Sequence, residues 1–201
     1  MRIFCVGRNY SEHAKELGNA VPENPVIFSK PDTALLRNGD AFYLPDFSQD
    51  VHHEAELVIK ISKMGKKIQE KFASNYYQEI GFGIDFTARD IQSQLKSKGL
   101  PWELAKAFDG SAPIGEFIKK EELPTSIQFK LLKNRECVQM GNSDDMIFNM
   151  NQIVSFVSQY FTLKVGDLIY TGTPAGVGPV KIGDVLEGFI GDKKLLHCEV
   201  K

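Results

Sequence analysis

The sequence predicts a mixed α+β fold in which strands dominate. Short apolar runs with strand composition outnumber the segments with helical spacing. These runs are not separated by regular helical crossovers, which argues against a doubly wound parallel sheet. Turn residues are dense towards the C-terminus, where they separate the last predicted strands.

The predicted strands are short runs rich in β-branched and aromatic residues. In chain order they span Ile3–Val6, Val26–Ser29, Glu56–Ile61, Ile80–Phe86, Ile127–Leu132, Asp167–Thr171, Val185–Ile190 and Leu195–Val200. Helical spacing predicts four helices, at Ser11–Leu17, Glu70–Tyr77, Ala88–Lys98 and Asn151–Phe161. In the last of these, apolar residues recur at i, i+3, i+4 and i+7 and predict a stripe facing the core, formed by Ile153, Phe156, Val157 and Tyr160.

Length and composition indicate one globular domain, which we expect to span residues 1–201. Hydrophobic residues make up 42% and charged residues 25%, which excludes a disordered or fibrous chain. Lys and Arg number 24 against 26 Asp and Glu, so we expect no broad surface for nucleic acid or anionic membrane.

Several classes of protein lack support in the sequence. The 3 cysteines are too scattered for a disulfide framework or a thiolate zinc site. No glycine-rich nucleotide-binding motif precedes a helix. We see no signal peptide and no apolar run long enough to span a bilayer, and therefore expect a soluble, cytoplasmic protein.

Two carboxylates lead one of the predicted strands. Glu54 and Glu56 are two residues apart, so on a strand their side chains point to the same face, ~6–7 Å apart along the backbone. That spacing allows both to bind one cation. The alternative is a solvated pair on an exposed strand face, and the pair alone does not decide between them.

A third acidic position strengthens the metal hypothesis. Asp85 lies in an otherwise apolar predicted strand, where a buried charge must be paired or metal-bound. Its alternative role is a helix cap or a local ion pair with Arg89. Oxygen ligands without a nearby cysteine favour Mg²⁺ or Mn²⁺ over Zn²⁺ or copper.

Histidines offer a candidate base. His13 and Glu16 lie three apart on one helical face, where the carboxylate would fix the imidazole tautomer and raise its basicity. The alternative is an ordinary surface pair. His52 and His53 precede the acidic pair and either support a ligand or bond locally at the strand end.

Taken together, the motifs resemble the fumarylacetoacetate hydrolase family, and within it the small acylpyruvate hydrolase and oxaloacetate decarboxylase branch. In chain order they are Val6-Gly7-Arg8-Asn9-Tyr10, Phe28-Ser29-Lys30-Pro31, His52-His53-Glu54-Ala55-Glu56-Leu57, Asp85-Phe86-Thr87-Ala88-Arg89-Asp90, Gly99-Leu100-Pro101-Trp102, Met146-Ile147-Phe148 and Thr171-Gly172-Thr173-Pro174-Ala175-Gly176-Val177-Gly178. The resemblance covers nearly the whole chain. It implies a mixed β-roll or β-sandwich fold with few short helices, and a homodimer.

The resemblance also implies roles for individual residues. It places one Mg²⁺ or Mn²⁺ per subunit on Glu54, Glu56 and Asp85. It assigns catalysis to His13, Glu16 and Lys106. Substrate binding falls to Arg8, Lys30, Arg89, Gln92 and Thr173.

The implied substrate is a small 2-oxo acid. The leading expectation is metal-dependent C–C bond cleavage, either hydrolysis of an acylpyruvate to pyruvate and a carboxylic acid or decarboxylation of oxaloacetate. The alternative within the fold is an isomerase or tautomerase of a keto–enol diacid. A non-catalytic metal-binding protein is a third hypothesis, but simple metal binding requires neither His13 and Glu16 nor Lys106.

Overall fold

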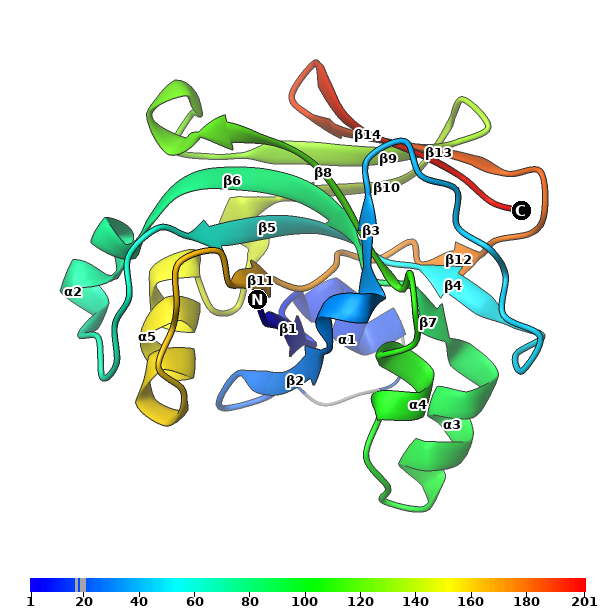
Figure 1. Cartoon of the computed structure of the whole chain (residues 1–201), viewed down its shortest axis with the longest axis horizontal. Coiled ribbons are helices and arrows are strands. Elements are labelled where there is room, and N and C mark those ends of the chain that lie inside the picture. The colour runs from blue at the N-terminus through cyan, green and yellow to red at the C-terminus, as the bar shows by residue number, and fades with distance from the viewer. Residues whose placement is uncertain (17, 19–20) are drawn as a thin grey trace.

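The computed structural model describes residues 1–16, 18 and 21–201 and confirms a strand-rich α+β fold (Figure 1). The strands are β1 (Ile3–Gly7), β2 (Val26–Lys30), β3 (Leu35–Arg37), β4 (Val51–His53), β5 (Ala55–Ile61), β6 (Tyr77–Ile84), β7 (Thr87–Ala88), β8 (Ala112–Lys119), β9 (Gln128–Lys133), β10 (Glu136–Asn142), β11 (Leu168–Tyr170), β12 (Gly178–Pro179), β13 (Val185–Ile190) and β14 (Lys193–Glu199). The helices are α1 (Ser11–Glu16), α2 (Glu70–Ala73), α3 (Arg89–Ser97), α4 (Glu103–Lys106) and α5 (Met150–Tyr160).

Three sheets organise these strands. The large sheet has 7 strands in the order β2-β1-β11-β5-β6-β8-β3, and it is mixed because β1 pairs with β11, and β3 with β8, in parallel. A 4-stranded antiparallel sheet has the order β10-β9-β13-β14. The third has 3 strands, β12-β4-β7. This curled, mixed arrangement is the β-roll that the resemblance implies.

The main core lies between the large sheet and the 4-stranded sheet, which lies over the curved β5 and β6 in Figure 1. Phe82 of β6 meets Phe129 of β9 edge to face, with ring centroids 6.2 Å apart. Gly188 of β13 is required here, because a Cβ at this position would lie 2.2 Å from the Phe82 ring. The two sheets therefore pack in direct contact.

Most predicted strands are confirmed within a few residues, with one difference that bears on the site. The strand predicted at Ile80–Phe86 ends two residues earlier in the structure. β6 ends at Ile84, and Asp85 lies just beyond it. The sequence patterns missed β3, β4, β7, β8, β10 and β12, of which several are only two or three residues long.

The helices follow the predictions less closely. The helix expected at Ser11–Leu17 is α1, and Leu17 lies outside the described residues. The helix expected at Glu70–Tyr77 ends at Ala73 and continues as a 3₁₀ turn, after which Tyr77 begins β6. The helix expected at Ala88–Lys98 is α3, and α4 was missed. Within the described residues, no helix combines the length and apolar character that crossing a membrane requires.

The predicted stripe on α5 was partly wrong. The helix begins at a capping box in which Asn149 and Gln152 each accept a hydrogen bond from the other's backbone N–H. Ile153 and Val157 face the core as predicted, but Val154 joins them, whereas Tyr160 is 64% exposed. The buried face is rotated by about one residue from the predicted stripe, and α5 packs against α2.

Candidate metal centre

Pairing of β5 with β6 assembles the three acidic residues. The antiparallel register places Ala55 opposite Ile84, and the Asp85 backbone N–H donates to the Glu54 carbonyl at 2.8 Å. Asp85 therefore lies beside Glu54 and Glu56 although about thirty residues separate them in sequence. Each of the three is at most 5% exposed, and one ligand oxygen from each lies within 4.8 Å of the others.

This donor set fits a hard divalent cation. All ligand atoms are carboxylate oxygens, which Mg²⁺ and Mn²⁺ prefer. Three buried like charges repel one another unless a cation neutralises them. Asp85 Oδ1 is buried and has no hydrogen-bond partner among the described residues, although the Lys30 ammonium lies 2.7 Å away. Glu54, Glu56 and Asp85 are thus the residues that could hold a divalent cation.

Three basic side chains surround the acidic cluster. Lys106 Nζ donates to Glu54 Oε2 at 2.8 Å, to Asp85 Oδ2 at 2.7 Å and to the Thr87 hydroxyl at 2.6 Å. Arg89 pairs with Glu54 at 2.5 Å, so the alternative in which Arg89 is the local partner of Asp85 is wrong. Asp85 is paired instead with Lys30 and Lys106, which approach from β2 and α4.

Burial and these neighbouring charges shift the pKa values of Glu54 and Glu56 in opposite directions. Burial acts to raise the pKa of Glu54, but Lys106 and Arg89 outweigh it and hold that pKa well below its usual range. Burial, with the charges of Asp85 and Glu54, raises the pKa of Glu56 well above its usual range. Burial acts to lower the pKa of Lys106, but Asp85 and Glu54 outweigh it and the pKa rises, so Lys106 stays cationic at neutral pH.

Removing the Lys106 charge is expected to destabilise the metal-free protein strongly. Lys106→Met removes the cation that pairs with the buried carboxylates of Glu54 and Asp85. The free energy of unfolding should therefore fall by about 3–5 kcal/mol. Thermal unfolding in chelator measures it, and added Mg²⁺ should restore part of the loss. The matched control is Lys60→Met, because Lys60 pairs with Glu79 where both side chains are over a third exposed, and its loss costs at most about 1 kcal/mol. Equal destabilisation by the two variants would contradict the assigned ion pairs.

A small cavity brings the predicted site residues together. Of these residues its lining includes Arg8, His13, Glu54, Glu56, Asp85, Arg89, Gln92, Lys106 and Thr173. Its volume of about 30 Å³ is close to that of one water molecule. Glu16 and Lys30 do not line it: Glu16 lies behind His13 and Lys30 lies behind Asp85, so each acts through its neighbour.

The short helix α1 presents His13 to this cavity. His13 Nδ1 lies 3.0 Å from Glu16 Oε2, and because a carboxylate can only accept, Nδ1 carries the proton and Nε2 is left as the basic atom. Glu16 Oε1 accepts from the Gly176 N–H at 3.0 Å, which ties α1 to the loop after β11. Gly176 has φ +97°, and a Cβ there would lie 2.5 Å from the Val138 carbonyl, so only glycine fits.

Neither histidine before the acidic pair enters the cavity. His52 bonds to Asp50 at 2.9 Å, as the local alternative proposed. His53 is buried and lies 2.9 Å from Gln139 Oε1, and burial lowers its pKa to about 4. His53 therefore supports the strand that carries Glu54 from behind and is neutral at physiological pH.

Sequence reasoning did not assign roles to three residues near the cavity. Lys96 lines it from α3, and the spacing of Arg89, Gln92 and Lys96 at i, i+3 and i+7 could have placed all three on one helical face. Trp102 lies under the Arg8 guanidinium, 5.9 Å from ring centroid to Cζ. Gln139 supports Thr173 from β10, and no motif points to it.

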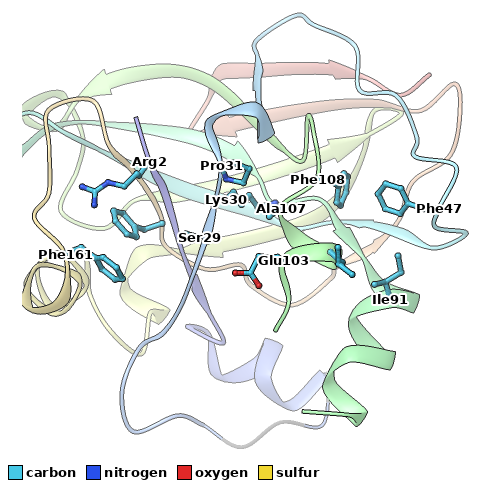
Figure 2. A pocket seen from close by; sticks show the side chains of 12 residues that line it. Arg2, Ser29, Lys30, Pro31, Phe47, Ile91, Glu103, Ala107, Phe108 and Phe161 are labelled. Carbon is cyan, nitrogen blue, oxygen red and sulfur yellow. The ribbon is translucent and has the colours of Figure 1, made fainter. Parts of the chain in front are cut away.

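A larger hollow among the described residues lies elsewhere, with a volume of about 900 Å³. Figure 2 shows Phe47 and Phe108 at one end and Arg2 and Phe161 at the other, with Glu103 between them. Most of its lining is apolar, and neither the acidic cluster nor His13 reaches it. It therefore offers a contact surface rather than a second polar site.

Comparison with protein families matches residues 2–200 to the model described as "Fumarylacetoacetate (FAA) hydrolase C-terminal". The chain belongs to the fumarylacetoacetate hydrolase family. Membership confirms the resemblance seen in the motifs. It also establishes the general class of the protein as an enzyme family.

Individual members of the family are similar over almost their whole length. The mitochondrial oxaloacetate tautomerase FAHD1 of Mus musculus is 42% identical over 201 residues, covering 99% of this chain and 91% of that protein. The oxaloacetate tautomerase YcgM of Escherichia coli K12 is 42% identical over 188 residues, covering 92% of this chain and 86% of that protein. Among solved structures, fumarylpyruvate hydrolase from Pseudomonas aeruginosa in complex with Mn²⁺ and pyruvate superimposes with a TM-score of 0.93 at 36% identity, covering 100% of this chain and 89% of that one.

Proposed function

We propose that this family member is a divalent-metal-dependent enzyme that forms the enolate of a 2-oxo acid, and that its reaction is the keto–enol tautomerisation of oxaloacetate. The observation that carries the proposal is the buried carboxylate cluster, which shares one small cavity with a basic histidine and several cations. The names of the two tautomerases support the substrate. A cation held by Glu54, Glu56 and Asp85 would supply Lewis-acid polarisation of the 2-oxo group.

Different side chains of the cavity would remove the C3 proton of the substrate and stabilise the charges that result. His13 Nε2 is placed to take a proton from C3 of the substrate, with Glu16 stabilising the charge on the imidazolium. Lys106, whose three N–H groups are bonded to Glu54, Asp85 and Thr87, would stabilise by its positive charge the oxygen that becomes negative as the C3 proton leaves. Protonation of that oxygen gives the enol. The reaction thus moves one proton from C3 to oxygen, the C2–C3 bond becomes double, the C2–O bond becomes single, and no carbon–carbon bond is broken.

Arg89, Gln92 and Thr173 would hold the substrate carboxylate. Arg89 Nη1 donates to Gln92 Oε1 at 2.7 Å, which orients the guanidinium towards the cavity. Four cationic side chains and three carboxylates line the cavity, so a bound divalent cation would leave it strongly positive. This excess favours a dianion such as oxaloacetate.

The second candidate is C–C bond cleavage, the leading expectation from the sequence. It is favoured by the His13–Glu16 pair in a cavity with room for about one water molecule, because such a pair can activate water. The oxygen of that water would bond to the distal carbonyl carbon of an acylpyruvate. Cleavage of the C–C bond would then release a carboxylic acid and pyruvate. The solved fumarylpyruvate hydrolase supports this candidate.

Nuclear magnetic resonance of the products distinguishes the candidates. Oxaloacetate, acetylpyruvate and fumarylpyruvate are each incubated with Mg²⁺ and enzyme, and the Glu56→Ala variant serves as the background for spontaneous reaction. The proposal predicts interconversion of enol and keto oxaloacetate with all four carbons retained. Enzyme-dependent pyruvate from acetylpyruvate or fumarylpyruvate, without accelerated tautomerisation of oxaloacetate, would establish the hydrolase instead.

We also propose that the chain forms a homodimer, as the resemblance implies, and that it acts in the cytoplasm, as the sequence leads us to expect. The apolar hollow supports a second copy as its cover, because Leu104 and Phe47 on its rim are 71% and 55% exposed. Light scattering should give twice the chain mass, and Leu104→Glu should reduce it to the monomer mass. A monomer at all concentrations would refute the dimer.

A further inference from the structure

Gln139 lies behind the cavity wall, where its side-chain amide joins three segments. The residue is 2% exposed and lies on β10, next to an irregularity in the pairing of β10 with β9. Its Oε1 accepts from the Ala55 backbone N–H at 3.0 Å. Its Nε2 donates to the Thr173 hydroxyl at 2.8 Å and to the Pro174 carbonyl at 3.1 Å.

The orientation of this amide is determined by backbone groups that cannot exchange roles. A backbone N–H only donates, so Oε1 must face Ala55. A carbonyl only accepts, so Nε2 must face Pro174. If the amide were turned over, Nε2 would face the Ala55 N–H, donor against donor, and Oε1 would face the Pro174 carbonyl, acceptor against acceptor. Both mismatches would be buried. His53 Nδ1 also faces Oε1 and must therefore donate, whichever charge state the ring has.

The fixed amide determines the direction of the Thr173 hydroxyl. Since Thr173 Oγ1 accepts from Gln139 Nε2, its own proton cannot be directed at Gln139. The other acceptor in reach is the Pro174 carbonyl, at a long 3.5 Å and already bonded to Nε2. Thr173 lines the cavity beside Lys106 and Arg89, so its O–H is free to donate into it.

We propose that Gln139 is a positioning residue that holds the Thr173 hydroxyl as a hydrogen-bond donor to a negatively charged oxygen of the substrate. The inference rests on the proposed function in one respect, that the cavity binds a 2-oxo acid. A hydroxyl can ordinarily donate or accept; this one is committed to donating before the substrate arrives. The committed donor favours a carboxylate or enolate oxygen over a neutral hydroxyl or amide donor group at the same place.

The test is a double-mutant cycle read by binding. Pyruvate is titrated calorimetrically into Mg²⁺-loaded wild type, Gln139→Met, Thr173→Val and the double variant. Removing a hydrogen bond to a charged oxygen should weaken pyruvate binding by about tenfold or more. We expect both single variants to show this loss and the double variant to show no more than either. KM for oxaloacetate should rise with little change in kcat, and Mg²⁺ affinity should not change.

Three further variants separate positioning from a structural role. Gln139→Glu keeps an acceptor for Ala55 but forces the Thr173 hydroxyl to donate to residue 139, so pyruvate binding should weaken even if Gln139→Met folds poorly. Thr173→Ser should retain wild-type affinity because it keeps the hydroxyl. Gln128→Met is the matched control, since Gln128 is exposed on the neighbouring strand β9 and should leave pyruvate binding unchanged.

The outcomes distinguish this inference from the proposed function. If wild type binds pyruvate and the effects of Gln139→Met and Thr173→Val multiply, Gln139 does not act through Thr173 and the inference is overturned. Unchanged affinity in a folded Gln139→Glu variant would overturn it equally. If wild type binds Mg²⁺ but neither pyruvate nor oxaloacetate, the proposed function fails, and the inference fails with it.

Discussion

Glu56→Ala is expected to abolish every metal-dependent activity of the protein. Glu56 is 2% exposed, and its Oε2 accepts from the Gly172 backbone N–H at 2.6 Å, so the carboxylate is held in place beside Glu54 and Asp85. If Glu54, Glu56 and Asp85 hold the cation as proposed, this variant removes one of three protein ligands, and the cavity has no other carboxylate to replace it among the described residues. Turnover of oxaloacetate with saturating Mg²⁺ should fall to the uncatalysed rate.

The matched control for this variant is Glu56→Gln, which keeps the size and shape of the side chain. Glutamine lacks the charge that binds the cation, so Mg²⁺ binding and turnover should again be lost. Burial and the charges of Asp85 and Glu54 raise the pKa of Glu56 and so disfavour its charged form without a cation, and in chelator the neutral variant should therefore unfold at or above the wild-type temperature. Loss of activity without loss of stability would assign the effect to the cation. Mg²⁺-dependent turnover in Glu56→Gln near the wild-type rate would show that the cation is bound elsewhere.

His13→Ala is expected to lower kcat by about 10²–10⁴, the usual range for loss of a general acid or base. The side chain is 5% exposed and lines the cavity, and its Nδ1 is committed to Glu16, so Nε2 is the atom available to the substrate. The loss should affect both tautomerisation and any hydrolysis, because each requires a proton to be taken up. Mg²⁺ affinity should change little, since His13 is not among the ligands.

Two further variants test the role assigned to His13. In Glu16→Gln the amide can accept from His13 or from Gly176 but cannot serve both, so kcat should fall by less than in His13→Ala. His197→Ala removes a histidine that is partly exposed on β14 and does not line the cavity, and it should leave kcat unchanged. Wild-type turnover in His13→Ala would show that another group moves the proton.

Residues that carry recognisable chemistry could be predicted from the sequence. Glu54 and Glu56 share a strand end, and Asp85 is a charge at the end of an apolar run, so their local patterns are informative without a structure. The fold class could also be predicted, because most of the buried strands have a clear apolar pattern. The three carboxylates come together only through the register of β5 against β6, which local sequence patterns do not determine.

Residues that act through tertiary contacts could not be predicted in the same way. Arg89 was the partner that the alternative role of Asp85 required, yet Asp85 forms its ion pairs with Lys30 and Lys106, which come from β2 and α4. Proximity in sequence was misleading here, because the turn after β6 directs Asp85 into the cluster and α3 directs Arg89 to Glu54. Gln139 is a similar case, since it reaches the site only because β10 packs behind the loop that carries Thr173.

The central claim is that the carboxylate cluster and its cation allow the cavity to form the enolate of a 2-oxo acid. Exchange of the C3 protons of pyruvate with D₂O, followed by nuclear magnetic resonance, tests that step without any later C–C cleavage. The account predicts exchange well above the buffer rate with wild type and Mg²⁺ or Mn²⁺, and none above that rate in chelator or in Glu56→Ala. Exchange at the buffer rate by fully Mg²⁺-loaded wild type, or enzyme-catalysed exchange that survives in Glu56→Ala, would contradict it.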